Sequence, residues 1–147
     1  MDYINSGISG IAQILNGNYQ CFMFLTNIGS SFGVNNLSHV IMNTPVNIIP
    51  NTGSSPYWGP DAWATVNMNT GAIDLWNVGS ISDYTIQEIS QGFLHELVHY
   101  ATQGYDVAIA MTLGFQYSGS NPNYADDATV LAASGYWDDH LKANCKF

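Results

Sequence analysis

The motif H-E-x-x-H lies at the centre of the stretch Phe93-Leu94-His95-Glu96-Leu97-Val98-His99-Tyr100. On an α-helix, side chains at positions i and i+4 share one face, so both imidazoles can point at a single metal ion. The carboxylate of Glu96 stands beside the first imidazole, where it can reach a metal-bound water and act as a general base. Histidine nitrogens together with an open position for water are typical of catalytic zinc. The stretch therefore predicts a Zn²⁺ site with His95 and His99 as ligands.

The residues before the motif indicate a helix with a well-marked start. Thr85 and Glu88 have the spacing of a capping box, in which each side chain binds a free backbone N–H of the first turn. Gly104 stands where a glycine commonly ends a helix. Apolar residues recur at helical spacing between these points and predict a buried stripe at Ile86, Ile89, Phe93, Leu97 and Ala101.

A third protein ligand is expected, since catalytic zinc usually takes three. No glutamate follows Glu96, which excludes a downstream glutamate. We favour Asp106, because it lies seven residues beyond His99, just past the expected helix end, where Gly104 can turn the chain back. The other candidates come later in the chain: Asp126 or Asp127 as second choice, His140 as third, and Asp138 and Asp139.

The rest of the chain is typical of one α+β domain spanning residues 1–147. Two alternating segments, 64–68 and 72–76, flank Asn69-Thr70-Gly71 and predict a β-hairpin. Residues 37–49 are rich in β-branched side chains and favour a strand that includes His39, expected to be a hydrogen-bonded structural histidine. The apolar run 19–28 fits a buried helix or a buried strand equally well. Helices are expected at residues 7–15 and, capped by Asp126 or Asp127, from there toward Leu141.

The charge composition restricts the class of partner. The 147 residues carry a net charge of −9, with no arginine and with Lys142 and Lys146 as the only lysines. Nucleic acids and anionic membrane surfaces are bound through clustered basic residues, so neither is an expected partner. The absence of arginine also excludes arginine-based recognition of a carboxylate or phosphate.

Cys21 and Cys145 bear on the compartment in which the protein works. They can form a disulfide between the two ends of the chain, which would suit an oxidising environment, or they can be two buried free thiols. The sequence starts without a basic region typical of a signal peptide, and no apolar run reaches the roughly 20 residues that span a bilayer. We therefore expect export by a signal-independent route, or a domain cut from a longer chain.

Further roles can be assigned only as alternatives. Tyr100, Tyr105 and Tyr136 are candidates to donate a hydrogen bond to the oxyanion of a tetrahedral intermediate, because a phenol is the obvious donor in a chain without arginine. Asp74, on the strand before the motif helix, is a candidate to hold the second nitrogen of a ligating imidazole.

The segment from Ala72 through Tyr100 resembles the zincin metallopeptidases, in which an edge strand precedes the H-E-x-x-H helix and pairs with an extended substrate. Residues 72–77, Ala-Ile-Asp-Leu-Trp-Asn, correspond to that strand. The resemblance implies that His95 and His99 bind zinc and that Glu96 serves as general base and acid. It also implies a zincin-like fold, with a small twisted sheet packed on the motif helix and a C-terminal helical part.

Within this group, the Thr-capped helix and the core His-Glu-Leu-Val-His-Tyr look like the metallopeptidase toxin domains of bacterial polymorphic and type VI secretion effectors. That likeness implies a protein that is secreted or delivered into another cell or the periplasm, and an immunity protein as partner. Metzincins carry Gly and His where Thr102 and Tyr105 stand here. The aspartate-ligand zincins are therefore nearest, although their Gly-Thr-x-x-Asp segment is absent.

Three functions follow as hypotheses. The first is a zinc endopeptidase that binds peptide or protein as an extended strand, with Glu96 activating the water. The second is a binding module in which the metal is structural or absent and a surface rich in Tyr and Asn recognises the partner. The third is a zinc hydrolase of a non-protein substrate, for which the acidic chain disfavours strongly anionic molecules.

Overall fold

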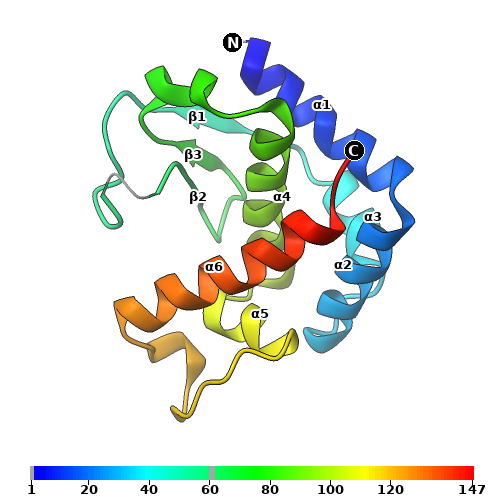
Figure 1. The fold of residues 1–147 in the computed structure, drawn as a ribbon, viewed down its shortest axis with the longest axis vertical. Coiled ribbons are helices and arrows are strands. Elements are labelled where there is room, and N and C mark those ends of the chain that lie inside the picture. The colour runs from blue at the N-terminus through cyan, green and yellow to red at the C-terminus, as the bar shows by residue number, and fades with distance from the viewer. Residues whose placement is uncertain (1, 60–61) are drawn as a thin grey trace.

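The computed structural model of the chain describes residues 2–59 and 62–147, and its fold class is α+β, as expected. A small three-stranded sheet lies on one side of the helices, next to the motif helix (Figure 1). The elements in chain order are α1 (Asp2–Gly17), α2 (Tyr19–Ser31), α3 (Leu37–Met42), β1 (Ile48–Pro50), β2 (Ala64–Val66), β3 (Ile73–Leu75), η1 (Val78–Asp83), α4 (Ile86–Thr102), α5 (Asp106–Thr112), η2 (Pro122–Tyr124) and α6 (Asp127–Asn144).

The motif helix α4 runs through the middle of the molecule, with α1, the sheet and α6 around it (Figure 1). The expected capping box is confirmed: the Thr85 hydroxyl accepts from the Glu88 N–H, and the Glu88 carboxylate accepts from the Thr85 N–H. Ile89, Phe93 and Leu97 are fully or almost fully buried. Burial of this stripe fixes the rotation of α4 and thereby the direction in which the two motif histidines point.

Helix α1 packs closely against the first half of α4 at two glycines. A Cβ atom on Gly7 would lie 2.5 Å from a methyl carbon of Ile89, and one on Gly10 would lie 2.0 Å from the Ser90 hydroxyl. The hydroxyl of Ser90 also donates a hydrogen bond of 2.8 Å to the Gly7 carbonyl. The two helices therefore approach at a distance that only glycine allows.

The sheet has the strand order β1-β3-β2, with β1 parallel and β2 antiparallel to the central strand. The hairpin of β2 and β3 is confirmed. The expectation that residues 72–77 form an edge strand is wrong, because β3 lies between the other two strands with Ile73 and Leu75 fully buried. The edge strand beside α4 is β2.

Residues 37–49 do not form the strand that their β-branched side chains predict, and His39 lies in helix α3. Asn36 caps this helix, since its side chain accepts a hydrogen bond from the His39 N–H. Leu37 and Ile41 lie one helical turn apart and are both buried. Burial of that pair outweighs the weak strand preference of the segment, and only β1 remains extended. The ambiguous run 19–28 lies in helix α2, which Asn18 caps in the same way.

Helix α4 ends differently from the expectation. Its last residue is Thr102, and Gln103, not Gly104, takes the left-handed conformation, with φ 55°. Gly104 is required for a different reason: a Cβ atom there would lie 2.7 Å from the Phe32 ring. The turn sends the chain directly into α5, which places Asp106 next to the end of the motif helix.

Cys21 and Cys145 form a disulfide that joins α2 to the end of α6. The Gln91 side chain of α4 donates a hydrogen bond of 2.7 Å to the Cys145 carbonyl, so the same point is also tied to the motif helix. A disulfide is compatible with an oxidising compartment. Within residues 2–59 and 62–147, no helix is both long and apolar enough to cross a membrane.

Candidate metal centre

The structure brings His95, His99 and Asp106 together. Each offers one possible ligand atom, and the three atoms lie within 4.8 Å of one another. The Asp106 Oδ1 atom is 3.0 Å from His99 Nε2 and 3.6 Å from His95 Nε2. Both imidazoles are almost completely buried, at 8% and 7% exposure. A group of two imidazoles and one carboxylate at this spacing could hold a metal ion, as the sequence predicts.

The other ring nitrogen of each histidine is already engaged. His95 Nδ1 is 3.0 Å from Asp138 Oδ1, and His99 Nδ1 is 2.6 Å from the Gly104 carbonyl oxygen. In the neutral imidazoles these Nδ1 atoms carry the proton and donate it to the oxygens, which leaves a lone pair on each Nε2 that could coordinate a metal ion. In the metal-free protein, a hydrogen bond from Nε2 to the Asp106 carboxylate requires a proton on Nε2. The tautomer and the ring orientation that metal binding needs are thus set by the protein.

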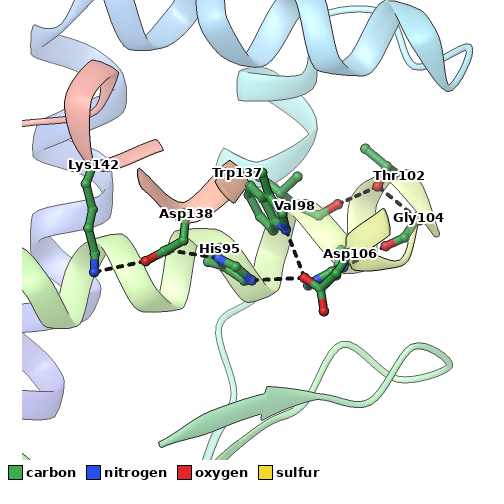
Figure 2. A network of polar contacts seen from close by, with 9 residues as sticks. His95, Val98, Thr102, Gly104, Asp106, Trp137, Asp138 and Lys142 are labelled. Atoms are coloured by element: carbon green, nitrogen blue, oxygen red, sulfur yellow. Dashed lines mark hydrogen bonds and ion pairs between the residues drawn. The ribbon is translucent and has the colours of Figure 1, made fainter. Parts of the chain in front are cut away.

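A chain of polar contacts extends from His95 through Asp138 to Lys142, as Figure 2 shows. The second oxygen of Asp138 is 2.9 Å from Lys142 Nζ, one turn further along α6. This ion pair fixes the carboxylate that holds His95. It also places one of the two lysines of the chain behind the site, outside the space between the three candidate ligands.

Trp137 forms the back wall of the centre. Its ring stacks on His95 with 3.7 Å between centroids and meets His99 edge-on at 5.3 Å. Its indole N–H donates a hydrogen bond of 2.8 Å to Asp106 Oδ1. Trp137 is completely buried, so its own position is fixed. Through these contacts it restrains all three candidate ligands.

The electrostatics of the centre follow from burial and from these contacts. Burial lowers the pKa of His95, but the neighbouring carboxylates Asp106 and Asp138 outweigh it and raise that pKa to about 10. Burial acts to raise the pKa of Asp106, yet hydrogen bonds with His95 and His99 hold it well below its usual range. The carboxylate of Asp106 therefore stays ionised, as a metal ligand must.

Glu96 lies next to the group but is not part of it. Its side chain is only partly buried and lines the same cleft as the two histidines. Burial raises the pKa of the carboxyl group, while the two imidazoles and the backbone N–H of Val66 act in the opposite direction. A carboxyl group of raised pKa beside a metal site is suited to accept and return a proton.

The centre lies at the floor of a cleft of about 610 Å³. One wall is built from β2 and the segment before it, including Tyr57, Trp58 and Trp63. The opposite wall is the first half of α6, including Val130 and Leu131. Figure 1 shows the same arrangement, with this half of α6 and the sheet on the same side of α4.

The edge of β2 presents backbone groups to this cleft that are not bonded to β3. Trp76 donates to the Trp63 carbonyl and Asn67 donates to the Ala72 carbonyl, so residues 63, 65 and 67 are bonded to the central strand. Antiparallel pairing alternates, which turns the N–H and C=O groups of Ala64 and Val66 away from β3. The effect of the Val66 N–H on the Glu96 carboxylate is consistent with that direction.

The remaining candidates for the third ligand are not part of the three-residue group. Asp126 caps α6 by accepting a hydrogen bond of 2.7 Å from the Thr129 N–H, and Asp127 lines the cleft outside the three-residue group. Asp139 is exposed, and His140 Nδ1 is 2.9 Å from the Tyr136 carbonyl within α6.

Among the three candidate tyrosines, only Tyr105 lines the cleft. The Tyr136 hydroxyl donates to the Leu113 carbonyl, and the Tyr100 ring packs against Gly71. Asp74 does not hold a motif histidine, because its carboxylate accepts a hydrogen bond from the Asn51 side chain.

Sequence reasoning missed the supporting roles of Asp138 and Trp137. Asp138 was a candidate ligand but proves to be the partner of His95, and Trp137 was not singled out. They lie 42 and 43 positions after His95, and their relation to it depends on how α6 crosses α4. The spacing of residues along the chain carries no signal for such a crossing.

Comparison with known proteins identifies no relative of this chain. No protein-family model, no curated protein and no solved structure matches it.

Proposed function

We propose that this protein is a zinc-dependent endopeptidase. The observation that carries the proposal is the placement of two imidazoles and a carboxylate, with a second carboxylate beside them, at the floor of an open cleft. The H-E-x-x-H motif, the helix that carries it and the strand edge along the cleft together resemble the zincins. A disulfide between the chain ends supports action outside a reducing cytosol, in line with a secreted effector.

The donor set suits zinc in type and in spacing. Tetrahedral zinc with bonds of about 2.0–2.1 Å places neighbouring donor atoms about 3.3 Å apart. The separations of 3.0 and 3.6 Å from Asp106 Oδ1 to the two Nε2 atoms bracket that value. His95, His99 and Asp106 would hold the ion, and three protein ligands leave one tetrahedral position open. When bound, zinc supplies a Lewis acid that polarises a carbonyl group and makes a neighbouring water more acidic.

Glu96 performs the proton transfers in this proposal. Its carboxylate takes a proton from the attacking water and later gives it to the nitrogen of the leaving amine. Partial burial favours the protonated carboxyl group and the neighbouring positive charges favour the carboxylate, so the side chain can serve in both directions.

The substrate is proposed to be an extended peptide. The N–H and C=O groups of Ala64 and the C=O group of Val66 point away from β3 and can pair with a peptide backbone as an added strand, while the Val66 N–H contacts Glu96. Backbone pairing does not depend on the side chains of the substrate. Any selection among substrate side chains must therefore come from the walls of the cleft. Tyr105 is the candidate to donate a hydrogen bond to the substrate carbonyl oxygen as negative charge develops there.

A Glu96→Gln variant tests the proposal. We expect zinc-loaded protein to cleave an unfolded protein substrate or a quenched-fluorescence peptide, and Glu96→Gln to bind zinc equally well while losing at least about 100-fold in cleavage rate. The matched control is Glu88→Gln, which makes the same change on the same helix, where glutamine also completes a capping box. Retention of cleavage by Glu96→Gln would refute the proposed role.

A further inference from the structure

The α6 wall of the cleft carries exposed side chains. Residues of α6 that line the cleft recur at helical spacing and form one stripe, next to the face that carries the buried residues Ala133, Trp137 and Leu141. Leu131 in the stripe is 51% exposed. Gly135 also lines the cleft but has no side chain, and we call the other five residues the α6 stripe: Asp127, Val130, Leu131, Ser134 and Asp138.

Apart from the two motif histidines, the titratable side chains with a charge at neutral pH that the structure places along the cleft are all acidic. Its lining residues include Glu96, Asp106, Asp127 and Asp138 but no lysine or arginine. Asp106 interacts with both motif histidines, and Asp138 is paired with Lys142 and His95. A divalent cation held at the centre would offset the charges of Asp106 and Glu96.

Asp127 lies apart from the histidines and from Lys142, the groups that could balance its charge. Among the residues that the structure describes, it forms no ion pair and no side-chain hydrogen bond, and the capping of α6 is already done by Asp126. It is exposed, and it begins the α6 stripe at the end furthest from the centre. Eleven residues of helix, at 1.5 Å each, separate it from Asp138 by about 16 Å.

We propose that the cleft selects substrates with a basic side chain, which binds Asp127, while apolar side chains nearer the cleavage point contact Val130 and Leu131. This inference rests on the proposed endopeptidase function. An extended peptide rises about 3.3 Å per residue, and the side chains of lysine and aspartate span part of the distance. The basic residue therefore lies about three to five positions from the scissile bond.

The net charge of the whole chain also favours substrates with basic side chains. With a net charge of −9 and no arginine, the protein attracts cationic segments and repels acidic ones before contact. Contact with Asp127 makes that general attraction specific for one position of the peptide. An acidic residue three to five positions from the scissile bond meets both the overall field and the Asp127 carboxylate, and is disfavoured.

The test uses a set of quenched-fluorescence peptides that differ only by Lys, Gln or Glu at positions three to five on either side of the scissile bond. For zinc-loaded wild type we expect kcat/KM about 3- to 5-fold higher for Lys than for Gln at one of these positions, and lowest for Glu, as an exposed ion pair allows. The preference should shrink in high salt. Equal kcat/KM for the three residues would overturn the inference.

Variants at Asp127 assign the effect to that side chain. Asp127→Asn should remove the positional preference, Asp127→Lys should reverse it, and Asp127→Glu should retain it. The matched control is Asp83→Asn, which removes one exposed charge outside the cleft and should leave the positional preference unchanged. A preference that persists in Asp127→Lys would assign the selection to the overall charge and contradict the role of Asp127.

A binding measurement separates failure of the charge selection from failure of the endopeptidase proposal. Zinc-loaded Glu96→Gln protein is titrated with the Lys and Glu peptides, and the affinity difference reports the charge preference without any cleavage. If wild type cleaves none of the peptides, the proposed activity is wrong. If Glu96→Gln also binds the Lys and Glu peptides equally, the charge selection is wrong as well.

Discussion

His95 is held on three sides by groups from two other helices. Asp138 contacts its Nδ1 atom, Asp106 faces its Nε2 atom, and Trp137 stacks on its ring. These contacts can stabilise either a protonated His95 ring or a His95 ring that binds a metal ion. In the metal-free protein the two carboxylates favour the imidazolium ion, so a metal ion must displace a proton from His95 to bind.

The stability of the metal-free protein should therefore depend on pH in a defined window. The pKa of His95 is raised from 6.5 to about 10, so the ion pairs of its imidazolium stabilise the fold fully below pH 6.5. That stabilisation is lost as pH rises from about 6.5 to about 10. Denaturant unfolding in the presence of a chelator should show a falling free energy of unfolding across this range. Asp106→Asn should flatten the fall, and a rise with pH would contradict the assigned contacts.

Removal of the carboxylate behind His95 should weaken metal binding without removing a ligand. For Asp138→Ala we expect zinc affinity to fall by about 10- to 100-fold, because the His95 ring loses the partner that fixes its tautomer and orientation. Competition with a chromophoric chelator measures the affinity. Asp139→Asn, which alters an exposed neighbour on the same helix, should change it little. Unchanged affinity in Asp138→Ala would show that the contact is dispensable.

At the scale of elements, α4 is positioned by close contacts on two of its faces. Gly7 and Gly10 of α1 approach it on one side. On the other, a Cβ atom on Gly92 would lie 2.0 Å from a ring carbon of Trp63, which itself packs on Tyr84 and Phe93. Gly92 thus lets the segment leading into β2 reach α4 one turn before Glu96, which brings the strand edge to the cleft.

The Gly92→Ala substitution should reverse the usual effect of alanine in a helix. Alanine normally stabilises a helix interior by up to about 1 kcal/mol relative to glycine. At Gly92 the overlap with Trp63 should instead lower the free energy of unfolding by about 1–3 kcal/mol. Gly135→Ala in α6 is the matched control, because nothing lies within 4 Å of its Cβ position, and it should be neutral or stabilising. Equal effects at the two sites, measured by chemical denaturation, would contradict the packing described.

At the scale of the whole molecule, the two ends of the chain are joined beside the helix that supports the centre. The disulfide links residues 124 positions apart and fixes the end of α6, the helix that carries Trp137 and Asp138. Asn18 reinforces the junction by donating to the Asn144 and Lys146 carbonyls.

Loss of this disulfide should be costly. In the Cys21→Ser/Cys145→Ser double variant we expect the free energy of unfolding to fall by about 2–5 kcal/mol, because a cross-link over so long a loop strongly restricts the unfolded chain. Denaturation of wild type with and without reductant provides the comparison. A reductant that lowers the midpoint of wild type and leaves the double variant unchanged would agree with the bond, and insensitivity of wild type would contradict it.

Local patterns predicted the parts of this molecule that depend on neighbours in sequence. The capping box, the buried stripe of α4, the β2–β3 hairpin and the Asp126 cap all involve residues a few positions apart. The nearness of Asp106 to the motif could also be predicted, because a short turn joins it to α4.

The features that were missed depend on packing between distant elements. The 37–49 segment is mostly helical because Leu37 and Ile41 are buried, and β3 is central because β1 pairs with its far side. Asp138 reaches His95 only through the crossing of α6 over α4. The prediction that residues 1–147 form one domain stays a prediction.

The central claim is that His95, His99 and Asp106 bind one zinc ion with a position left open for water. An anomalous-scattering map of zinc-loaded crystals, measured on both sides of the zinc absorption edge, tests it directly. We expect one peak within about 2.0–2.2 Å of both Nε2 atoms and an Asp106 oxygen. A peak at other residues, or none in protein that has been exposed to zinc, would contradict it.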